Sequence, residues 1–214
     1  MLLASGALLA AVPGAAQVPQ PDPAVTNTVH CPYDMMTSDD REMALLLYER
    51  EAMASGPRSE SQNLTVIDRL VTEAQAKCAA PLRWTSARTI AAKAYTMNAL
   101  MREGVSQALD SKAHTTAPIA AYYNAHRDEL TGQSLLSGAM AEHLQAYLVV
   151  LGWDKLDLAT LGVGVFYLQA LITAQRSESA FAAAPLGTTA LLSKPKLKRP
   201  HQRSRAMTKK RGKP

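Results

Sequence analysis

Apolar residues recur every three or four positions between residues 38 and 180, which is the spacing of one buried face on an α-helix. Polar capping residues and Gly or Pro breaks divide this stretch into about six segments. The predicted helices cover residues 38–54, 59–79, 86–112, 118–130, 134–151 and 158–179. Because the connections are short, we expect three antiparallel hairpins in an all-α helical bundle, with the long third helix as its central element.

The third predicted helix carries the clearest apolar stripe, and this stripe should face the core. Its members are Ile90, Ala94, Met97, Met101, Val105 and Ala108. Gly104 lies beside the stripe and is expected to bend the helix. The last two helices are also apolar, but polar side chains interrupt both of them. We therefore expect these two helices to be buried in the core rather than to span a membrane.

The composition supports helices over strands. Ala and Leu supply 37 and 27 residues, whereas aromatic residues make up only 5%. Ala and Leu favour helices, and aromatic residues favour strands, so a β-sandwich or β-barrel is not expected. Two cysteines are too few for a disulfide-rich scaffold or for a zinc site with four thiolate ligands.

The N-terminal residues resemble a secretory signal peptide. Residues 2–12 form an apolar run that ends at Pro13 and Gly14, and small residues follow at a candidate cleavage site. No Lys or Arg precedes the run, so either the α-amino group supplies the positive charge or the chain begins upstream. We expect residues 1–16 to be cleaved and residues 17–37 to be a disordered, proline-rich linker. The mature protein would then be periplasmic or secreted; the alternative is an apolar N-terminus with no export role.

The two cysteines are expected to form a disulfide. Cys31 precedes the first predicted helix, and Cys78 lies at the end of the second. A short turn containing Gly56 and Pro57 makes these helices antiparallel, which places the start of one beside the end of the other. A bridge would close a loop of about 48 residues and stabilise the fold by roughly 4 kcal/mol. The alternative is two unrelated buried thiols.

The net charge of +5 divides unevenly along the chain. Residues 194–214 contain ten basic and no acidic side chains, whereas the remaining residues contain 13 basic and 18 acidic ones. The basic positions are Lys194, Lys196, Lys198, Arg199, Arg203, Arg205, Lys209, Lys210, Arg211 and Lys213. We expect residues 181–214 to be a disordered connector and basic tail that binds polyanions in a salt-dependent way. In an exported protein its partner would be an anionic surface or an acidic protein rather than nucleic acid.

Two histidines lie on the apolar faces of consecutive predicted helices. The turn near Gly132 brings His126 and His143 toward each other, with heights that differ by roughly 6 Å. One interpretation is a pair of partly buried histidines that bond to a tyrosine or a carbonyl group. The other is a metal or acid–base site that also uses Tyr122 or Tyr123. The Glu-x-x-His spacing of diiron bundles is absent, and we expect no cofactor.

No sequence pattern indicates nucleophilic or nucleotide chemistry. The chain lacks a Gly-x-Ser-x-Gly elbow, a phosphate loop and a His-Glu-x-x-His motif. Gly162 and Gly164 lie within an apolar helix, where close helix packing explains them. The expected function is therefore a non-enzymatic, exported binding module with a polyanion-binding tail. The alternatives are a metal-binding or enzymatic protein that uses the two histidines, and a nucleic-acid-associated protein that lacks a signal peptide.

Overall fold

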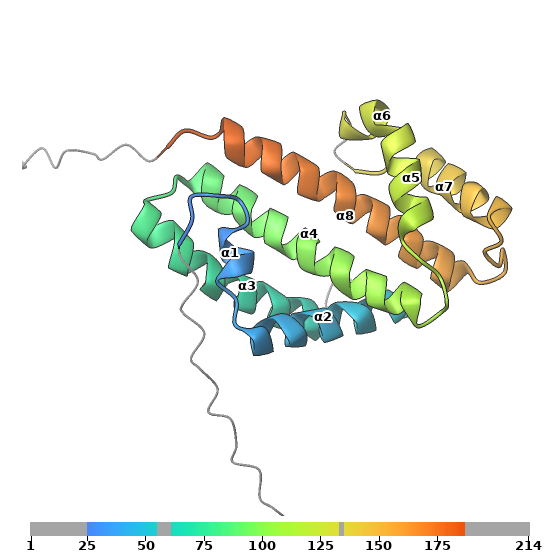
Figure 1. Cartoon of the computed structure of the whole chain (residues 1–214), viewed down its shortest axis with the longest axis horizontal. Helices are drawn as coiled ribbons and strands as arrows, with labels where there is room; N and C mark the ends of the chain where they lie inside the picture. Colours follow the sequence, from blue (N-terminus) through green and yellow to red (C-terminus); the bar gives the residue numbers. More distant parts are fainter. Residues whose placement is uncertain (1–24, 55–60, 133–134, 187–214) are drawn as a thin grey trace, which may run out of the picture.

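The computed structural model describes residues 25–54, 61–132 and 135–186, which form eight helices and no strands (Figure 1). The helices are α1 (Cys31–Asp34), α2 (Ser38–Met53), α3 (Gln62–Leu82), α4 (Ser86–Asp110), α5 (Ala117–Ala125), α6 (Arg127–Thr131), α7 (Gly138–Val150) and α8 (Leu158–Ala183). The expected all-α fold is confirmed. The predicted signal peptide and the basic tail lie outside the described residues.

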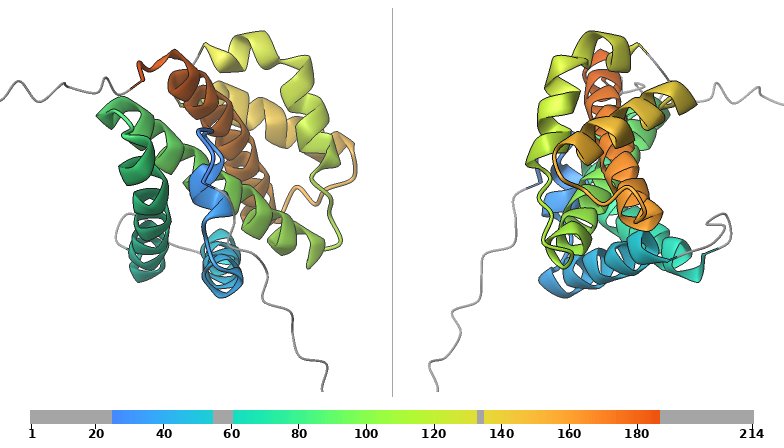
Figure 2. Two further views of the ribbon diagram at one scale, coloured as in Figure 1. Left: turned by 60° about the vertical axis from the view of Figure 1, so that its left-hand side comes forward. Right: turned by 90° about the vertical axis from the view of Figure 1, so that its right-hand side faces the viewer.

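Helix α4 is the centre of the molecule, as expected for the long third helix. It packs most extensively against α8, and α2 packs against it from another side. Figures 1 and 2 show α2 and α3 on one side of the α4–α8 pair, and α5, α6 and α7 on the other. Residues of α4 enter all three apolar clusters of the core, including Leu100, Leu109 and Tyr95.

Side-chain caps explain where most of the helices begin. In five cases the residue before the helix accepts a hydrogen bond from a backbone N–H in the first turn. These residues are Thr37, Ser61, Thr85, Ser137 and Asp157. Each such bond satisfies a donor that the helix itself leaves free.

Several predicted boundaries are wrong. The segment expected to be a linker, residues 17–37, contains α1 in its described part. Helix α3 continues through Pro81, in its last turn, and ends where Arg83 adopts a left-handed conformation. The helix expected at residues 118–130 divides at His126, whose backbone leaves the helical conformation. Helix α7 begins later than expected, after its cap Ser137, and α8 extends beyond the predicted end of the domain.

The predicted order of hairpins is also wrong at its centre. Helix α4 pairs with α8 and not with α5, because the turn after α4 leads α5 across α8 (Figure 1). This pairing buries the side of α4 that carries Ala91 and Tyr95. Ile90, which was expected in the core, is consequently 66% exposed.

Helix α8 is long and apolar enough to cross a membrane by length and composition, and it alone passes that test among the described residues. In the structure it packs against α4 along the core and also contacts α5, α6 and α7. Ten of its residues are buried, among them Leu168 and Ile172. A helix at the centre of a folded bundle passes the same test, and these contacts are those of a core helix.

Gly104 permits the close approach of α2 to α4. A Cβ atom at this position would lie 2.6 Å from the Cβ of Tyr48 and 2.8 Å from the carbonyl oxygen of Leu45. The expected bend is therefore not the reason for this glycine, since its missing side chain leaves room for the backbone of α2. Gly164 has a related but milder role, because a Cβ there would lie 3.0 Å from Leu148.

Candidate functional site

Two neighbouring tyrosines on α5 face different parts of the molecule. Tyr122 is 2% exposed and its side chain reaches His143 on α7. Tyr123 is 6% exposed and lines a cavity between α4, α5 and α8. The candidate residues of the sequence analysis therefore divide between two environments, rather than forming a single site.

The structure brings both predicted histidines to Tyr122. Its hydroxyl lies 3.0 Å from Nδ1 of His143, and its ring centroid lies 4.5 Å from that of His126. The two imidazole centroids are 5.4 Å apart. Burial, with Glu129 as a smaller cause, raises the pKa of Tyr122, so its hydroxyl keeps a proton that it can donate to His143.

The histidine cluster supplies few ligands for a metal. His143 is exposed, and Nδ1 of His126 lies 3.7 Å from the exposed carboxylate of Glu129. The part of the chain that the structure describes contains no group of three or more His, Cys, Asp or Glu side chains that could hold an ion. The arrangement is that of a hydrogen-bonded ring cluster between α5 and α7.

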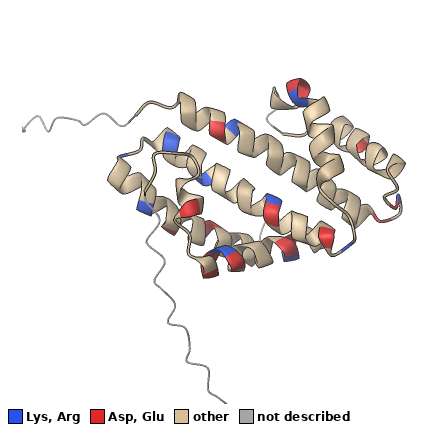
Figure 3. Ribbon diagram, viewed as in Figure 1, with Lys and Arg blue, Asp and Glu red and all other residues tan. Residues whose placement is uncertain are grey.

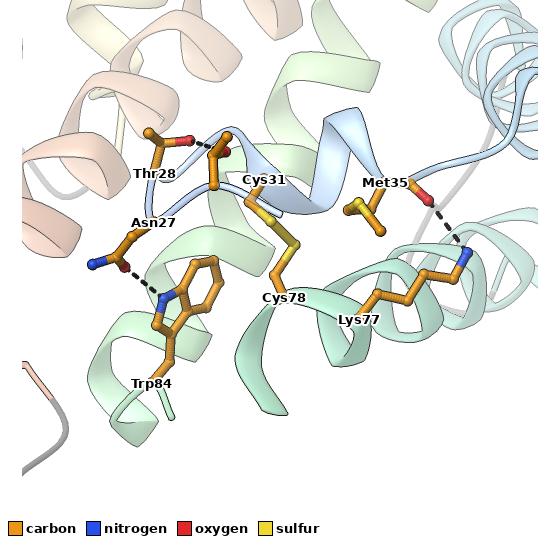
Figure 4. The surroundings of a disulfide bond; sticks show 8 residues. Asn27, Thr28, Cys31, Met35, Lys77, Cys78 and Trp84 are labelled. Carbon is orange, nitrogen blue, oxygen red and sulfur yellow. Dashed lines mark hydrogen bonds between the residues drawn. A yellow bond between two sulfur atoms is a disulfide. The ribbon is translucent and has the colours of Figure 1, made fainter. Parts of the chain in front are cut away.

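Cys31 and Cys78 are joined in a disulfide that links α1 to α3 (Figure 4). Their Sγ atoms are 2.03 Å apart, and both side chains are fully buried. The neighbouring chain is held by further contacts: Nζ of Lys77 donates to the carbonyl of Met35 at 3.3 Å. The bridge therefore fastens a short N-terminal segment to the body of the bundle.

Tyr33 ties the same segment to α4 and α2. Its hydroxyl donates to Oε1 of Glu103 at 2.6 Å, and the guanidinium of Arg41 lies 4.5 Å from its ring centroid. Burial, together with the bond to Glu103, raises the pKa of Tyr33 to about 12. The hydroxyl thus remains a donor at any physiological pH.

Arg88 joins the two ends of the described body, and no sequence pattern indicates this role. It is 8% exposed; Nη1 donates to Oδ1 of Asn27 at 3.2 Å, and Nε donates to the carbonyl of Ala184 at 3.1 Å. Its guanidinium also lies 4.7 Å from the ring centroid of Phe181, and Trp84 donates to the same Asn27 oxygen. The first and last described segments, near Asn27 and Ala184, therefore meet at the start of α4.

Fold and site together define an all-α protein with one buried disulfide, in which Arg88 joins the first and last described segments of the bundle. No protein-family model, curated protein or solved structure matches the chain.

Proposed function

We propose that the chain is an exported, non-enzymatic binding module whose basic tail attaches it to an anionic surface. The buried Cys31–Cys78 disulfide is the observation that carries export, since such bonds persist in oxidising compartments. The apolar run at residues 2–12 supports the same compartment, because it has the length and the flanking small residues of a signal peptide.

The charge distribution supports separate roles for the body and the tail, with the tail as the part that binds an anionic surface. Along α2 five acidic residues oppose two basic ones, and Figure 3 shows acidic and basic residues interspersed elsewhere on the body. The ten basic residues of positions 194–214 carry no acidic neighbour in sequence. A surface that attracts the tail would hold the body through the end at which Arg88 joins Asn27 to Ala184.

The tail is expected to bind vesicles that contain anionic phospholipid at low salt, and binding should weaken as salt rises, because the attraction is electrostatic and screened. Co-sedimentation of the full chain with anionic and neutral vesicles measures this. Deletion of residues 194–214 should abolish binding, and replacement of the ten basic residues by Gln provides a control of equal length.

Undiminished vesicle binding by the deleted chain would contradict the proposed role of the tail. A parallel titration with duplex DNA compares the two candidate partners of the tail, an anionic membrane and nucleic acid. We propose a mature protein outside the cytoplasm, where DNA is not its partner. Two results together would overturn the proposal: the chain binds DNA more tightly than vesicles, and it stays inside the cell with its N-terminal residues intact. The protein would then be associated with nucleic acid.

A further inference from the structure

Helices α4, α5 and α8 line a half-open cavity of about 290 Å³ whose wall is partly polar and partly apolar. Tyr95 and Arg102 line it from α4, Tyr123 lines it from α5, and Glu178 lines it from α8. Leu171 and Ala174 add an apolar side, also from α8. The cavity thus combines a cation, two phenols and a carboxylate with a hydrophobic surface, which is a composition typical of a small-molecule site.

Two buried donors on this cavity lack partners. Among the described residues, four buried side-chain polar atoms have no hydrogen-bond partner, and two of these are Nε of Arg102 and the hydroxyl of Tyr123. Tyr123 is 6% exposed, so solvent at the surface does not satisfy its hydroxyl. Unpaired buried donors cost folding free energy, and an acceptor bound beside this cavity would recover part of that cost.

Tyr95 supplies a third donor. Burial raises the pKa of its hydroxyl, which therefore keeps its proton and can donate it. A guanidinium and two phenols offer donors and no strong acceptor. Because a carboxylate has two oxygens that accept several hydrogen bonds, it complements this set.

The carboxylate of Glu178 restricts which ligands the cavity can bind. Its side chain is exposed at the edge of the cavity, close enough to Tyr95 to help raise the pKa of that hydroxyl. Within the described part of the chain it forms no ion pair with Arg102. A simple anion would be repelled by Glu178, whereas a ligand with an adjacent ammonium group would be attracted.

We propose that this cavity binds a small zwitterionic α-amino acid. Its carboxylate is held by Arg102 and Tyr123, its ammonium group faces Glu178, and its aliphatic side chain packs on Leu171 and Ala174. The cavity volume suits a ligand of this size. The inference goes beyond the proposed export and tail binding and depends on neither.

Isothermal titration calorimetry of the full chain with four probes tests the ligand class. L-leucine and L-alanine carry both charges, 4-methylpentanoate is leucine without its amine, and 3-methylbutylamine is leucine without its carboxylate. We expect saturable binding of an amino acid, at least tenfold weaker binding of 4-methylpentanoate, and none of the amine. If no probe gives saturable heat with the wild-type chain, the proposal is wrong and the two donors are satisfied within the protein or by water.

Matched variants locate the site. Tyr123→Phe removes one hydroxyl that has no partner and is expected to weaken amino-acid binding at least tenfold without loss of thermal stability. Tyr122→Phe removes the neighbouring hydroxyl, which bonds to His143, and should lower the thermal midpoint while leaving the affinity unchanged. If the two variants bound the amino acid with equal affinity, the assignment of this cavity as the amino-acid site would be wrong.

Glu178→Gln tests the ammonium contact at an exposed position that tolerates substitution. It should erase the preference for leucine over 4-methylpentanoate without affecting folding. A preference that persists in this variant would contradict the proposed orientation of the ligand.

Discussion

Replacing Cys31 and Cys78 together by alanine is expected to lower the free energy of unfolding by roughly 4 kcal/mol. The bridge joins residues 47 positions apart, and a crosslink of this span restricts the unfolded chain by about that amount. Total stability of a domain is on the order of 5–15 kcal/mol, so the loss is a large share of it. Urea unfolding of the oxidised wild type, the reduced wild type and the double-alanine variant measures the difference.

The reduced wild type is the control for packing, because it keeps both sulfur atoms but lacks the bond. It should resemble the double-alanine variant and differ clearly from the oxidised protein. The segment around α1 should also exchange its backbone amides faster, since only non-covalent contacts, such as those of Tyr33, Asn27 and Met35, then hold it. Coincident urea midpoints for the oxidised and reduced proteins would contradict a stabilising role for the bridge.

Gly104→Ala is expected to destabilise the fold by about 3 kcal/mol, the upper part of the range for overpacking a core. The added Cβ would lie 2.6 Å from Cβ of Tyr48 and 2.8 Å from the backbone oxygen of Leu45. Neither atom belongs to the flexible end of a side chain, so α2 must move away from α4. Thermal and urea unfolding measure the loss.

Gly162→Ala is the matched control for this substitution. Gly162 also lies inside a long helix, α8, but a Cβ there meets no atom within 4 Å. Alanine is the better helix former by about 1 kcal/mol, so this variant should be slightly more stable than the wild type. If Gly104→Ala were as stable as Gly162→Ala, this would contradict the claim that α2 and α4 pack too closely for a Cβ atom at residue 104.

The sequence predicted the helices better than their pairing. Hydrophobic periodicity and capping residues are local signals. Thr37 and Asp157 are such caps, and a helix begins directly after each of them. Helix α1 was missed because four residues are too few to show a period. The pairing of α4 with α8 was missed because it joins segments distant in sequence, and the exposure of Ile90 follows from that pairing.

The candidate sites show the same division between local and distant signals. The approach of His126 to His143 and the pairing of Cys31 with Cys78 were both predicted from short spacings between neighbouring helices in the sequence. Arg88 and Arg102 gave no signal, because an arginine within a helical pattern is ordinarily a solvated side chain. Only the packing of α8 against α4 gives Arg88 its contact with Ala184, and places Glu178 on the cavity that Arg102 lines.

The central claim is that this helical bundle works outside the cytoplasm with its two cysteines joined. Intact mass and N-terminal sequence of the protein, purified from its own cells without reductant, test this most directly. The predicted result is a chain that begins near Gln17 and in which neither cysteine reacts with an alkylating reagent until reductant is added. A chain that keeps residues 1–16 and carries two alkylatable thiols would contradict it.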